Sequence, residues 1–305
     1  MRVLTGLNAV RRAPLRAVVT VGMFDGVHIA HQQLIRTTVR LARRSRGTSI
    51  VITFDPDPQL VLDPRHAPSP IMPLERRLQL IAALGADLVW VIPFTKTFAT
   101  LTPEDFVRRI LEERLRATCI VVGETFGFGR ARQGNLELLR TLGQQSRMRV
   151  VALTAVTRRG QVVSSSRIRR LIQTGDLAQA RQLLSRPFEL TGKVVHGSGR
   201  GHQLGFPTAN VRLVPTLMPP RGVYTVWLHH AARRWNGLMN LGTRPTFGKG
   251  PLVCEVYLPR FRGQLYGRLV TIGLLTRLRG EHRFRTPQAL VRQIQRDLLH
   301  ARLVS

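Results

Sequence analysis

The sequence predicts two consecutive folds: an α/β domain with a parallel, doubly wound sheet, followed by a small antiparallel β-barrel with a C-terminal helix. In the first 185 residues, short apolar runs alternate with amphipathic helical segments, which is typical of a parallel sheet covered by helices. From residue 188, short β-rich segments are separated by Gly, Pro and Asn turns, which favours an antiparallel barrel. The 305 residues suit two domains, which we place at residues 1–185 and 186–305.

The elements of the first domain follow from their apolar patterns. Thr102 is expected to cap a helix in which Pro103 takes the first position, because its missing N–H is not needed there. Ligands of doubly wound sheets bind outside the carboxyl ends of the strands, so the segments that follow strands are candidate sites. We expect strands at residues 17–21, 49–54, 88–92 and 119–122, helices at 32–44, 74–84 and 102–115, and candidate sites at 22–31, 54–58 and 123–129.

The second domain is expected to close with a helix over residues 286–303, which has Pro287 in its first turn. The apolar and β-branched segments before it are too short for helices and lie between turn residues, so they are expected to pair as strands. These expected strands are residues 190–196, 223–228, 238–241, 253–258 and 269–275.

Composition limits the class of protein. Apolar residues make up 43% of the chain, yet the longest apolar stretches are far too short to cross a bilayer. Cys119 and Cys254 are the two cysteines, which excludes a disulfide framework and gives no metal-ligand spacing. We expect a soluble cytoplasmic protein that acts on small molecules, and the oligomeric state stays open.

The formal net charge of +30 is the strongest compositional signal. Only three of the 47 basic residues are lysine, and the arginines are spread along the whole chain instead of forming a tail. Aromatic residues make up 6%, so platforms for stacking single-stranded bases are scarce. We expect salt-dependent, non-specific attraction to nucleic acid but no specific binding, and we attribute the charge to a bias for arginine over lysine.

A turn between the first apolar strand and its helix contains two histidines, His28 and His31, after Gly22 and Gly26. The first N–H groups of a helix have no internal partners and lie at the positive end of its dipole, so an anion is favoured there. An imidazole can donate a hydrogen bond to a phosphoryl oxygen. The alternative is that the histidines only cap the helix or pack against it.

Two further segments have the chemistry of phosphate sites. Ser164, Ser165 and Ser166 precede Arg167 at an expected helix start, where hydroxyls, amides and a guanidinium suit a triphosphate; a plain run of N-cap residues is the alternative. Residues 196–210 contain four glycines, which let backbone amides approach a phosphate, although a flexible hairpin has the same composition. The oxygens of Thr208 and Asn210 in this segment are ligands that suit Mg²⁺.

These segments carry a family resemblance. His-Ile-Ala-His at residues 28–31 resembles the His-x-Gly-His signature of the nucleotidyltransferase superfamily, and residues 20–32 resemble a block of prokaryotic bifunctional FAD synthetases. Gly-Phe-Pro-Thr-Ala-Asn at residues 205–210 matches the riboflavin kinase signature without a change. Further segments resemble the same family in the same order: residues 164–167, 222–224, 240–246, 265–267 and 278–284.

The resemblance implies a Rossmann-like FMN adenylyltransferase domain followed by a riboflavin kinase domain. The barrel would transfer the γ-phosphate of ATP to riboflavin, giving FMN, and the α/β domain would join AMP from a second ATP to FMN, giving FAD and pyrophosphate, with Mg²⁺ as cofactor. Glu255 occupies the position of the family's catalytic glutamate and is a plausible general base. The other implied roles are catalysis by His28, His31 and Arg167, flavin binding by Thr125, Arg279 and Glu281, metal binding by Thr208 and Asn210, and ATP binding by Gly22, Phe24, Ser164, Ser165, Gly197, Gly205, Pro207 and Thr208.

Four residues of the first domain depart from the family pattern: Met23, Ala30, Asp57 and Thr125. Ala30 adds a methyl group between the histidines, and Asp57 places an anion where the family has a histidine. Either change could slow adenylylation, so a riboflavin kinase with a slow or degenerate adenylyltransferase domain is the first alternative. An arginine-rich nucleic-acid-binding protein on a reused scaffold is the second.

Overall fold

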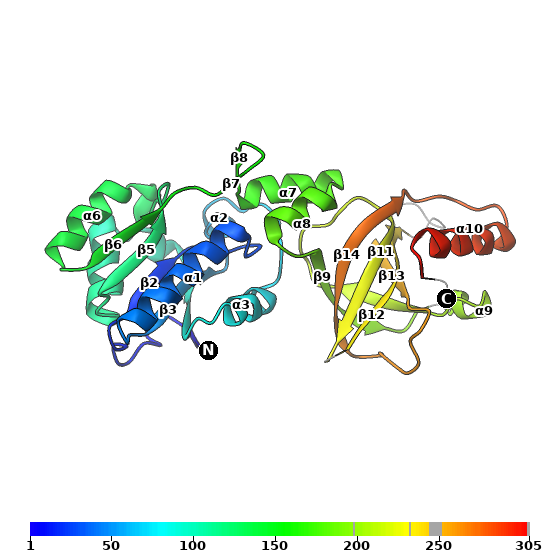
Figure 1. Ribbon diagram of the computed structural model, residues 1–305, viewed down its shortest axis with the longest axis horizontal. Coiled ribbons are helices and arrows are strands. Elements are labelled where there is room, and N and C mark those ends of the chain that lie inside the picture. Colours follow the sequence, from blue (N-terminus) through cyan, green and yellow to red (C-terminus); the bar gives the residue numbers. More distant parts are fainter. Residues whose placement is uncertain (198, 232, 244–251, 304–305) are drawn as a thin grey trace. The chain divides into compact units, whose positions relative to one another are not determined.

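The computed structural model describes residues 1–303 except 198, 232 and 244–251. These residues form two compact units: Met1–Pro70 with Leu74–Ser165, and Ile71–Pro73 with the chain from Ser166 onward. Figure 1 labels most of their helices and strands.

The first unit is built on a six-stranded, wholly parallel sheet with the order β1-β4-β3-β2-β5-β6. β2 and β5 are buried along nearly their whole length, as expected of strands covered on both faces. The strands are β1 (Arg2–Thr5), β2 (Val18–Val21), β3 (Ser49–Asp55), β4 (Leu88–Pro93), β5 (Cys119–Gly123) and β6 (Arg149–Leu153).

Helices cover both faces of this sheet. On one face Leu34, Leu41 and Ala42 of α1 pack against β2 and β5. On the other face a larger core joins residues of all six strands to Phe106 and Leu139. The helical segments are α1 (Ile29–Arg44), α2 (Pro58–Leu62), α3 (Leu74–Ala83), α4 (Lys96–Ala99), α5 (Pro103–Phe106), the π-helix η1 (Val107–Arg114), the 3₁₀-helix η2 (Arg130–Arg132) and α6 (Leu136–Gln145), before a hairpin of β7 (Thr157–Arg158) and β8 (Gln161–Val162).

The strand order creates a crevice at one edge of the sheet. From β2 the chain continues to β3 on one side, and it later returns to β5 on the other side of β2. The connections that leave the carboxyl ends of β2 and β5 therefore run in opposite directions, which is where doubly wound sheets bind ligands.

The second unit contains a closed barrel in which all neighbouring strands are antiparallel, in the order β10-β13-β12-β11-β14-β9. Two helices precede the barrel, and α8 packs against β9 and β14. The elements are α7 (Ser165–Thr174), α8 (Leu177–Leu184), β9 (Phe188–Val195), α9 (Arg200–Gln203), β10 (Thr208–Leu213), β11 (Gly222–His230), β12 (Arg233–Thr243), β13 (Leu252–Tyr257), β14 (Leu269–Arg279) and α10 (Pro287–His300).

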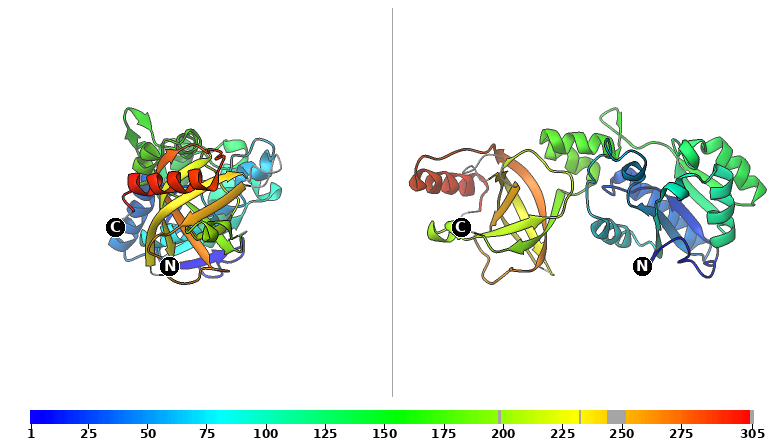
Figure 2. Two further views of the ribbon diagram at one scale, coloured as in Figure 1. Left: turned by 90° about the vertical axis from the view of Figure 1, so that its right-hand side faces the viewer. Right: turned by 180° about the vertical axis from the view of Figure 1, so that it is seen from behind.

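α10 lies outside the barrel, next to its strands (Figure 2). Its N-cap is Thr286, whose Oγ1 accepts a hydrogen bond from the Ala289 N–H at 3.2 Å. Asp297 is only 2% exposed and binds the Arg279 guanidinium at the end of β14 through both carboxylate oxygens, at 2.8–3.1 Å. This buried ion pair fixes the helix to the barrel.

The predicted fold class, a doubly wound parallel sheet followed by an antiparallel barrel with a closing helix, is confirmed. Five strands were not predicted: β1, β6, β7, β8 and β10. β1 and β6 are the short edge strands of the parallel sheet and contain no fully buried residue, although β6 includes the apolar run 150–153. The helix capped by Thr102 exists as expected, but it continues as the π-helix η1 after its first turn.

Candidate functional sites

The turn after β2 is a compact, buried structure that begins α1. Phe24 has a φ of 52° and is fully buried, and Gly26 follows it with a φ of 84°. His28 is the N-cap of α1, and its Nδ1 accepts a hydrogen bond from the His31 N–H at 3.4 Å. His28 therefore caps α1, and the cap holds its ring at the amino end of a 16-residue helix.

The two histidine rings are stacked. Their centroids are 3.5 Å apart with 19° between the planes, and Phe24 contacts the His31 ring edge-on at 5.2 Å. Nδ1 of His31 is buried and has no hydrogen-bond partner in the described part of the chain. Burial, followed by the nearby His28 and Arg77, lowers the pKa of His31 well below its usual value of 6.5, so the ring is neutral near pH 7.

Arg77 of α3 is a buried cation behind this turn, and no pattern in the sequence predicted its burial. It is 6% exposed, and its Nη1 and Nη2 donate to the carbonyl oxygens of Met23 at 2.7 Å and Phe54 at 3.4 Å. Burial lowers its pKa, while the carboxylates of Asp25, Asp55, Asp57 and Glu75 raise it. Arg77 therefore links the ends of β2 and β3 at the crevice.

The serine segment meets the histidine turn. The Ser165 hydroxyl donates to the carbonyl oxygen of Asp25 at 2.9 Å, which joins two segments 140 residues apart in sequence. Ser164 precedes it and is half-buried, and Arg167 is the third residue of α7. Gly22 and Phe24 belong to the same turn, so the first unit brings together His28, His31, Gly22, Phe24 and Ser165.

Ala30, Asp57 and Thr125, three of the four residues that differ from the family pattern, have defined positions in this unit. Ala30 is in the first turn of α1, and Thr125 is exposed just after β5, across the crevice from the histidine turn. Asp57 is the N-cap of α2, where its carboxylate accepts a hydrogen bond from the Gln59 N–H at 2.8 Å. Asp57 also lies close enough to Arg77 to raise its pKa, so its negative charge is partly compensated inside the protein.

The glycine-rich loop of the barrel closes over the two expected metal-binding side chains. A Cβ on Gly197 would overlap the Asn210 amide, and a Cβ on Gly201 would lie 3.0 Å from the Thr208 hydroxyl oxygen. Gly205, with a φ of 81°, turns the chain into Pro207 and β10. Thr208 and Asn210 stand on β10 and not in a loop, so alternate residues place both side chains on one face of the strand.

Glu255 lies between two asparagines on neighbouring strands. It pairs in register with Asn210 of β10 on one side and with Asn240 of β12 on the other. Cys254 and Val256 beside it are each 1% exposed, so Glu255, which is half-buried, stands on the opposite face of β13. A row of polar side chains with one carboxylate thus crosses three strands beside the glycine loop.

The expected flavin residues of the barrel have structural contacts. Arg279 is held by Asp297, and its guanidinium also lies 5.7 Å from the Phe284 ring centroid. A Glu281 carboxylate oxygen accepts a hydrogen bond from the Thr243 N–H at 3.2 Å, and Gly242 leaves the space that this carboxylate occupies. Their flavin contacts stay predictions, and residues 244–246 of the segment 240–246 lie outside the described residues.

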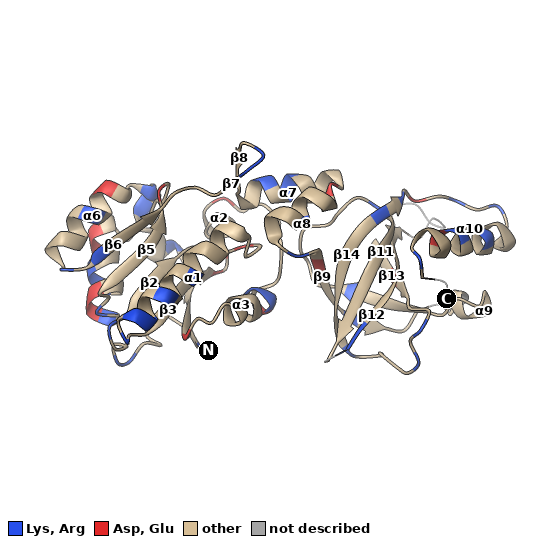
Figure 3. Cartoon of the chain, viewed as in Figure 1, with Lys and Arg blue, Asp and Glu red and all other residues tan. Residues whose placement is uncertain are grey.

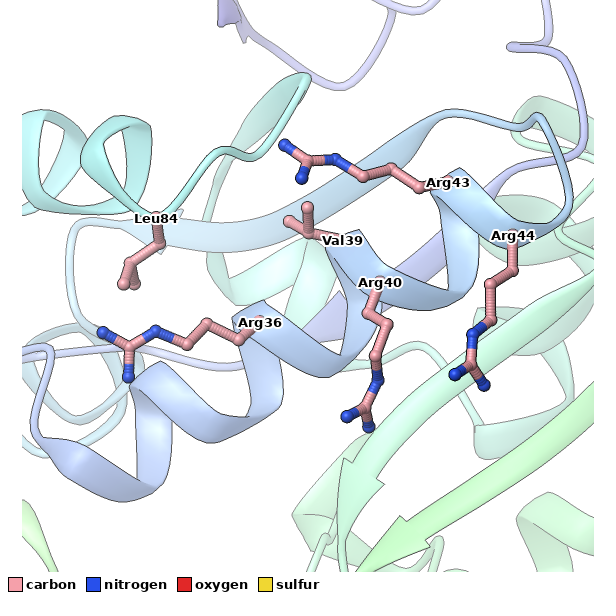
Figure 4. Close-up of a pocket in the computed structure, with 6 residues that line it drawn as sticks. All are labelled: Arg36, Val39, Arg40, Arg43, Arg44 and Leu84. Carbon is pink, nitrogen blue, oxygen red and sulfur yellow. The ribbon is translucent and has the colours of Figure 1, made fainter.

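Basic residues are distributed over both units (Figure 3). One groove of about 330 Å³ is lined by arginines of α1 that point outward from the helix, together with Val39 and Leu84 (Figure 4). Its arginines are Arg36, Arg40, Arg43 and Arg44, and none forms an ion pair with a carboxylate of the described chain.

Among the described residues, no helix is long and apolar enough to cross a membrane. These residues also include no group of three or more His, Cys, Asp or Glu side chains that could hold a metal ion by themselves.

Comparison with known proteins covers the whole chain. Residues 10–167 match a family model described as FAD synthetase, and residues 184–304 match one described as riboflavin kinase. Proteins from Pseudomonas fluorescens and Escherichia coli K12, each named bifunctional riboflavin kinase/FMN adenylyltransferase, are 35% and 34% identical to it. These matches span 100% and 99% of this chain and 98% and 97% of the relatives.

A solved structure from Streptococcus pneumoniae, described as a macrolide-efflux protein, has the same fold. Its TM-score with this chain is 0.91 at 29% sequence identity, and the match covers all of both chains.

Proposed function

This chain belongs to the family of bifunctional riboflavin kinases and FMN adenylyltransferases, and from that premise we propose which of its residues serve each reaction. The enzyme phosphorylates riboflavin to FMN with ATP, and adenylylates FMN to FAD with a second ATP. The kinase reaction is assigned to residues 186–305 and the adenylyl transfer to residues 1–185. The family matches support this boundary, because one ends at residue 167 and the other begins at 184. The cytoplasm is the proposed location.

Glu255 is the general base of the kinase reaction. Its carboxylate accepts the proton of the riboflavin 5′-hydroxyl as that oxygen bonds to the γ-phosphorus of ATP and the bond to ADP breaks. The single observation that carries this assignment is the register of Glu255 between Asn210 and Asn240, beside the glycine loop. The loop glycines, including Gly197 and Gly205, let backbone amides approach the ATP phosphates.

The side chains of Thr208 and Asn210 fit Mg²⁺. Both offer neutral oxygen ligands from one face of β10, and the backbone of Gly197 and Gly201 packs directly against them where a Cβ would collide. When bound there, Mg²⁺ would neutralise phosphate charge. Two protein ligands are typical of Mg²⁺, which usually completes its shell with waters and substrate phosphates.

Adenylyl transfer takes place at the crevice beside the histidine turn. An FMN phosphate oxygen is already an anionic nucleophile, so it bonds to the α-phosphorus of ATP as pyrophosphate leaves, and no general base is required. The chain must orient the phosphates and stabilise the charge that grows on them. We assign this to His28, His31, Ser164, Ser165 and Arg167, with Gly22 and Phe24 shaping the turn.

Product analysis tests the two assignments separately. We expect Glu255→Gln to lower FMN formation from riboflavin and Mg-ATP at least about 100-fold, and to leave conversion of supplied FMN to FAD unchanged. His28→Ala should have the opposite pattern. Chromatography of riboflavin, FMN and FAD gives both rates, and the exposed Glu137→Gln and His66→Ala are matched controls.

The outcomes are distinguishable. Loss of both activities in a folded Glu255→Gln protein would contradict separate sites. FMN accumulating without FAD in the wild type would favour the slow adenylyltransferase alternative. An unchanged FAD rate in His28→Ala would remove His28 from the adenylylation site.

A further inference from the structure

The arginine groove of α1, with a volume of about 330 Å³, is a cationic surface to which neither proposed reaction is assigned. α1 follows its N-cap His28 at the adenylylation crevice and runs back toward the amino ends of the strands, where β3 starts. Arg36, the groove arginine nearest to His28, is eight residues beyond it, or about 12 Å along the helix. Leu84 also lines the groove and lies just before β4, again at the amino ends of the strands. The groove is therefore separate from the candidate adenylylation site.

The charge of this groove has no counter-ion in the described part of the chain. α1 contains no Asp or Glu, no acidic residue lines the groove, and none of its arginines is in an ion pair among the described residues. Arg43 and Arg44 lie in the last turn of α1, where cations stabilise the negative end of the helix dipole. Arg36 and Arg40 lie further from that end, and like charges four residues apart destabilise a helix. The stability of this chain therefore does not explain them.

The groove combines this charge with an apolar wall. Val39 of α1 and Leu84, which follows α3, line it together with the arginines (Figure 4). The two segments approach closely at Gly85, where a Cβ would lie 3.4 Å from Nη2 of Arg43 and 3.8 Å from Cγ1 of Val39. A segment that carries apolar and acidic side chains next to one another would meet both parts of the groove.

The lining of the groove disfavours other occupants. No aromatic side chain lines it, so a single strand of nucleic acid would find phosphate contacts but no platform for its bases. Val39 is 6% exposed and Leu84 is half-buried, so neither protrudes to enter a membrane. A second copy of this chain carries the same net charge of +30 and would be repelled. An acidic segment of another protein is the occupant that these observations favour.

The spacing of the arginines matches a helix. Arg36, Arg40 and Arg44 form a ridge of residues four apart, which repeats about every 6 Å along α1. Glutamates four residues apart on a second helix repeat at the same interval. We propose that the arginine groove binds an acidic, amphipathic helix of a partner protein, with carboxylates on these three arginines and apolar side chains against the apolar wall. The proposal does not depend on which residues serve the two flavin reactions.

Fluorescence anisotropy of a labelled peptide with the full-length protein tests this surface at about 150 mM salt. The probe is an alanine-based helical peptide with glutamates four residues apart and leucines beside them, and its control has the same composition in a scrambled order. The wild type should bind the probe more tightly than the scrambled peptide. Arg36→Gln/Arg40→Gln should weaken binding of the probe about tenfold. Arg140→Gln/Arg147→Gln removes the same charge from exposed positions outside the groove and should not weaken it.

Binding of the probe that depends on both the groove and the glutamate spacing supports the proposal. No binding of the probe, equal binding of the scrambled peptide, or equal weakening by the two double variants would overturn it. A single-stranded oligouridylate and vesicles of phosphatidylserine and phosphatidylcholine are the competing ligands, and if either binds at the groove more tightly than the probe, the proposal is wrong. Both rates of the product assay should stay unchanged in Arg36→Gln/Arg40→Gln, so failure here is separate from failure of the proposed function.

Discussion

The His28 and His31 rings are stacked with their centroids 3.5 Å apart, and the buried Nδ1 of His31 has no partner in the described part of the chain. Two imidazolium rings at this distance would repel each other, and the nearby Arg77 adds to that repulsion. The turn therefore keeps His31 neutral near pH 7.

This arrangement predicts a pH dependence of stability. The folded-state pKa of His31 is below 6.5, so the unfolded chain binds more protons, and the stabilisation is complete above pH 6.5 and lost as the pH falls below it. One such group changes the free energy of unfolding by at most about 1.4 kcal/mol per pH unit. Urea unfolding at pH 5 and pH 7 should show a smaller loss in His31→Gln than in the wild type. Equal losses in the two proteins would contradict the low pKa.

Arg77 is expected to be a positioning residue for adenylyl transfer. Arg77→Met would leave the Met23 and Phe54 carbonyl oxygens without their donor and several carboxylates without a counter-charge, costing about 3 kcal/mol of stability. A shifted turn should also slow FAD formation at least about tenfold. Urea unfolding and the FMN-to-FAD rate measure the two effects.

Two controls isolate the role of Arg77. Arg77→Lys keeps the charge and should recover part of the FAD rate, while Arg140→Met on the exposed surface should change neither quantity. The riboflavin kinase rate of Arg77→Met is the internal reference. A stable Arg77→Met protein with the normal FAD rate would refute the positioning role.

The Arg279–Asp297 pair should matter more for stability than a surface ion pair. Asp297→Asn leaves the half-buried guanidinium of Arg279 without a counter-ion and is expected to cost about 3 kcal/mol in thermal or urea unfolding. Asp105→Asn, which breaks solvent-exposed pairs with Arg108 and Arg109, is the control and should have little effect. Similar stability of the two variants would contradict the anchoring role.

The same pair can test the flavin role of Arg279. If Arg279 only anchors α10, Arg279→Met and Asp297→Asn should change the KM for riboflavin equally. A larger KM increase in Arg279→Met would show that its guanidinium also contacts the flavin.

The arginine groove of α1 should contribute most of the non-specific attraction to nucleic acid. Arg36, Arg40 and Arg44 are one turn apart, about 6 Å along the helix, and each phosphate contact on a single strand contributes about 0.7 to the slope of log K against log salt. Fluorescence anisotropy with a 20-residue single strand should give a smaller slope when the groove arginines, Arg36, Arg40, Arg43 and Arg44, are changed to Gln.

A matched control separates this groove from the overall charge. Changing Arg65, Arg140, Arg147 and Arg159 to Gln removes the same number of exposed charges elsewhere. If both quadruple variants reduce the slope equally, the attraction depends on net charge alone and not on the groove.

Much of the candidate adenylylation site could be predicted from the sequence, because its residues are consecutive in the chain. The β2 strand, the glycine turn, His28 and the α1 helix are consecutive, so periodicity and helix-cap chemistry predict them without knowledge of the rest of the chain. The burial of Arg77 at this site could not be predicted from the sequence, since an arginine in a helix is ordinarily exposed. Only packing shows that it is buried against the Met23 and Phe54 carbonyls.

The sequence by itself determined the two fold classes, the histidine turn and the glycine loop with Thr208 and Asn210, because these depend on short-range patterns of apolar, glycine and capping residues. Only the tertiary structure decided which distant residues meet. Strand register set Glu255 between Asn210 and Asn240, and packing joined Ser165 to Asp25 and Trp235 to Phe261. Such contacts depend on how whole strands pair and close, and no local pattern in the chain encodes them.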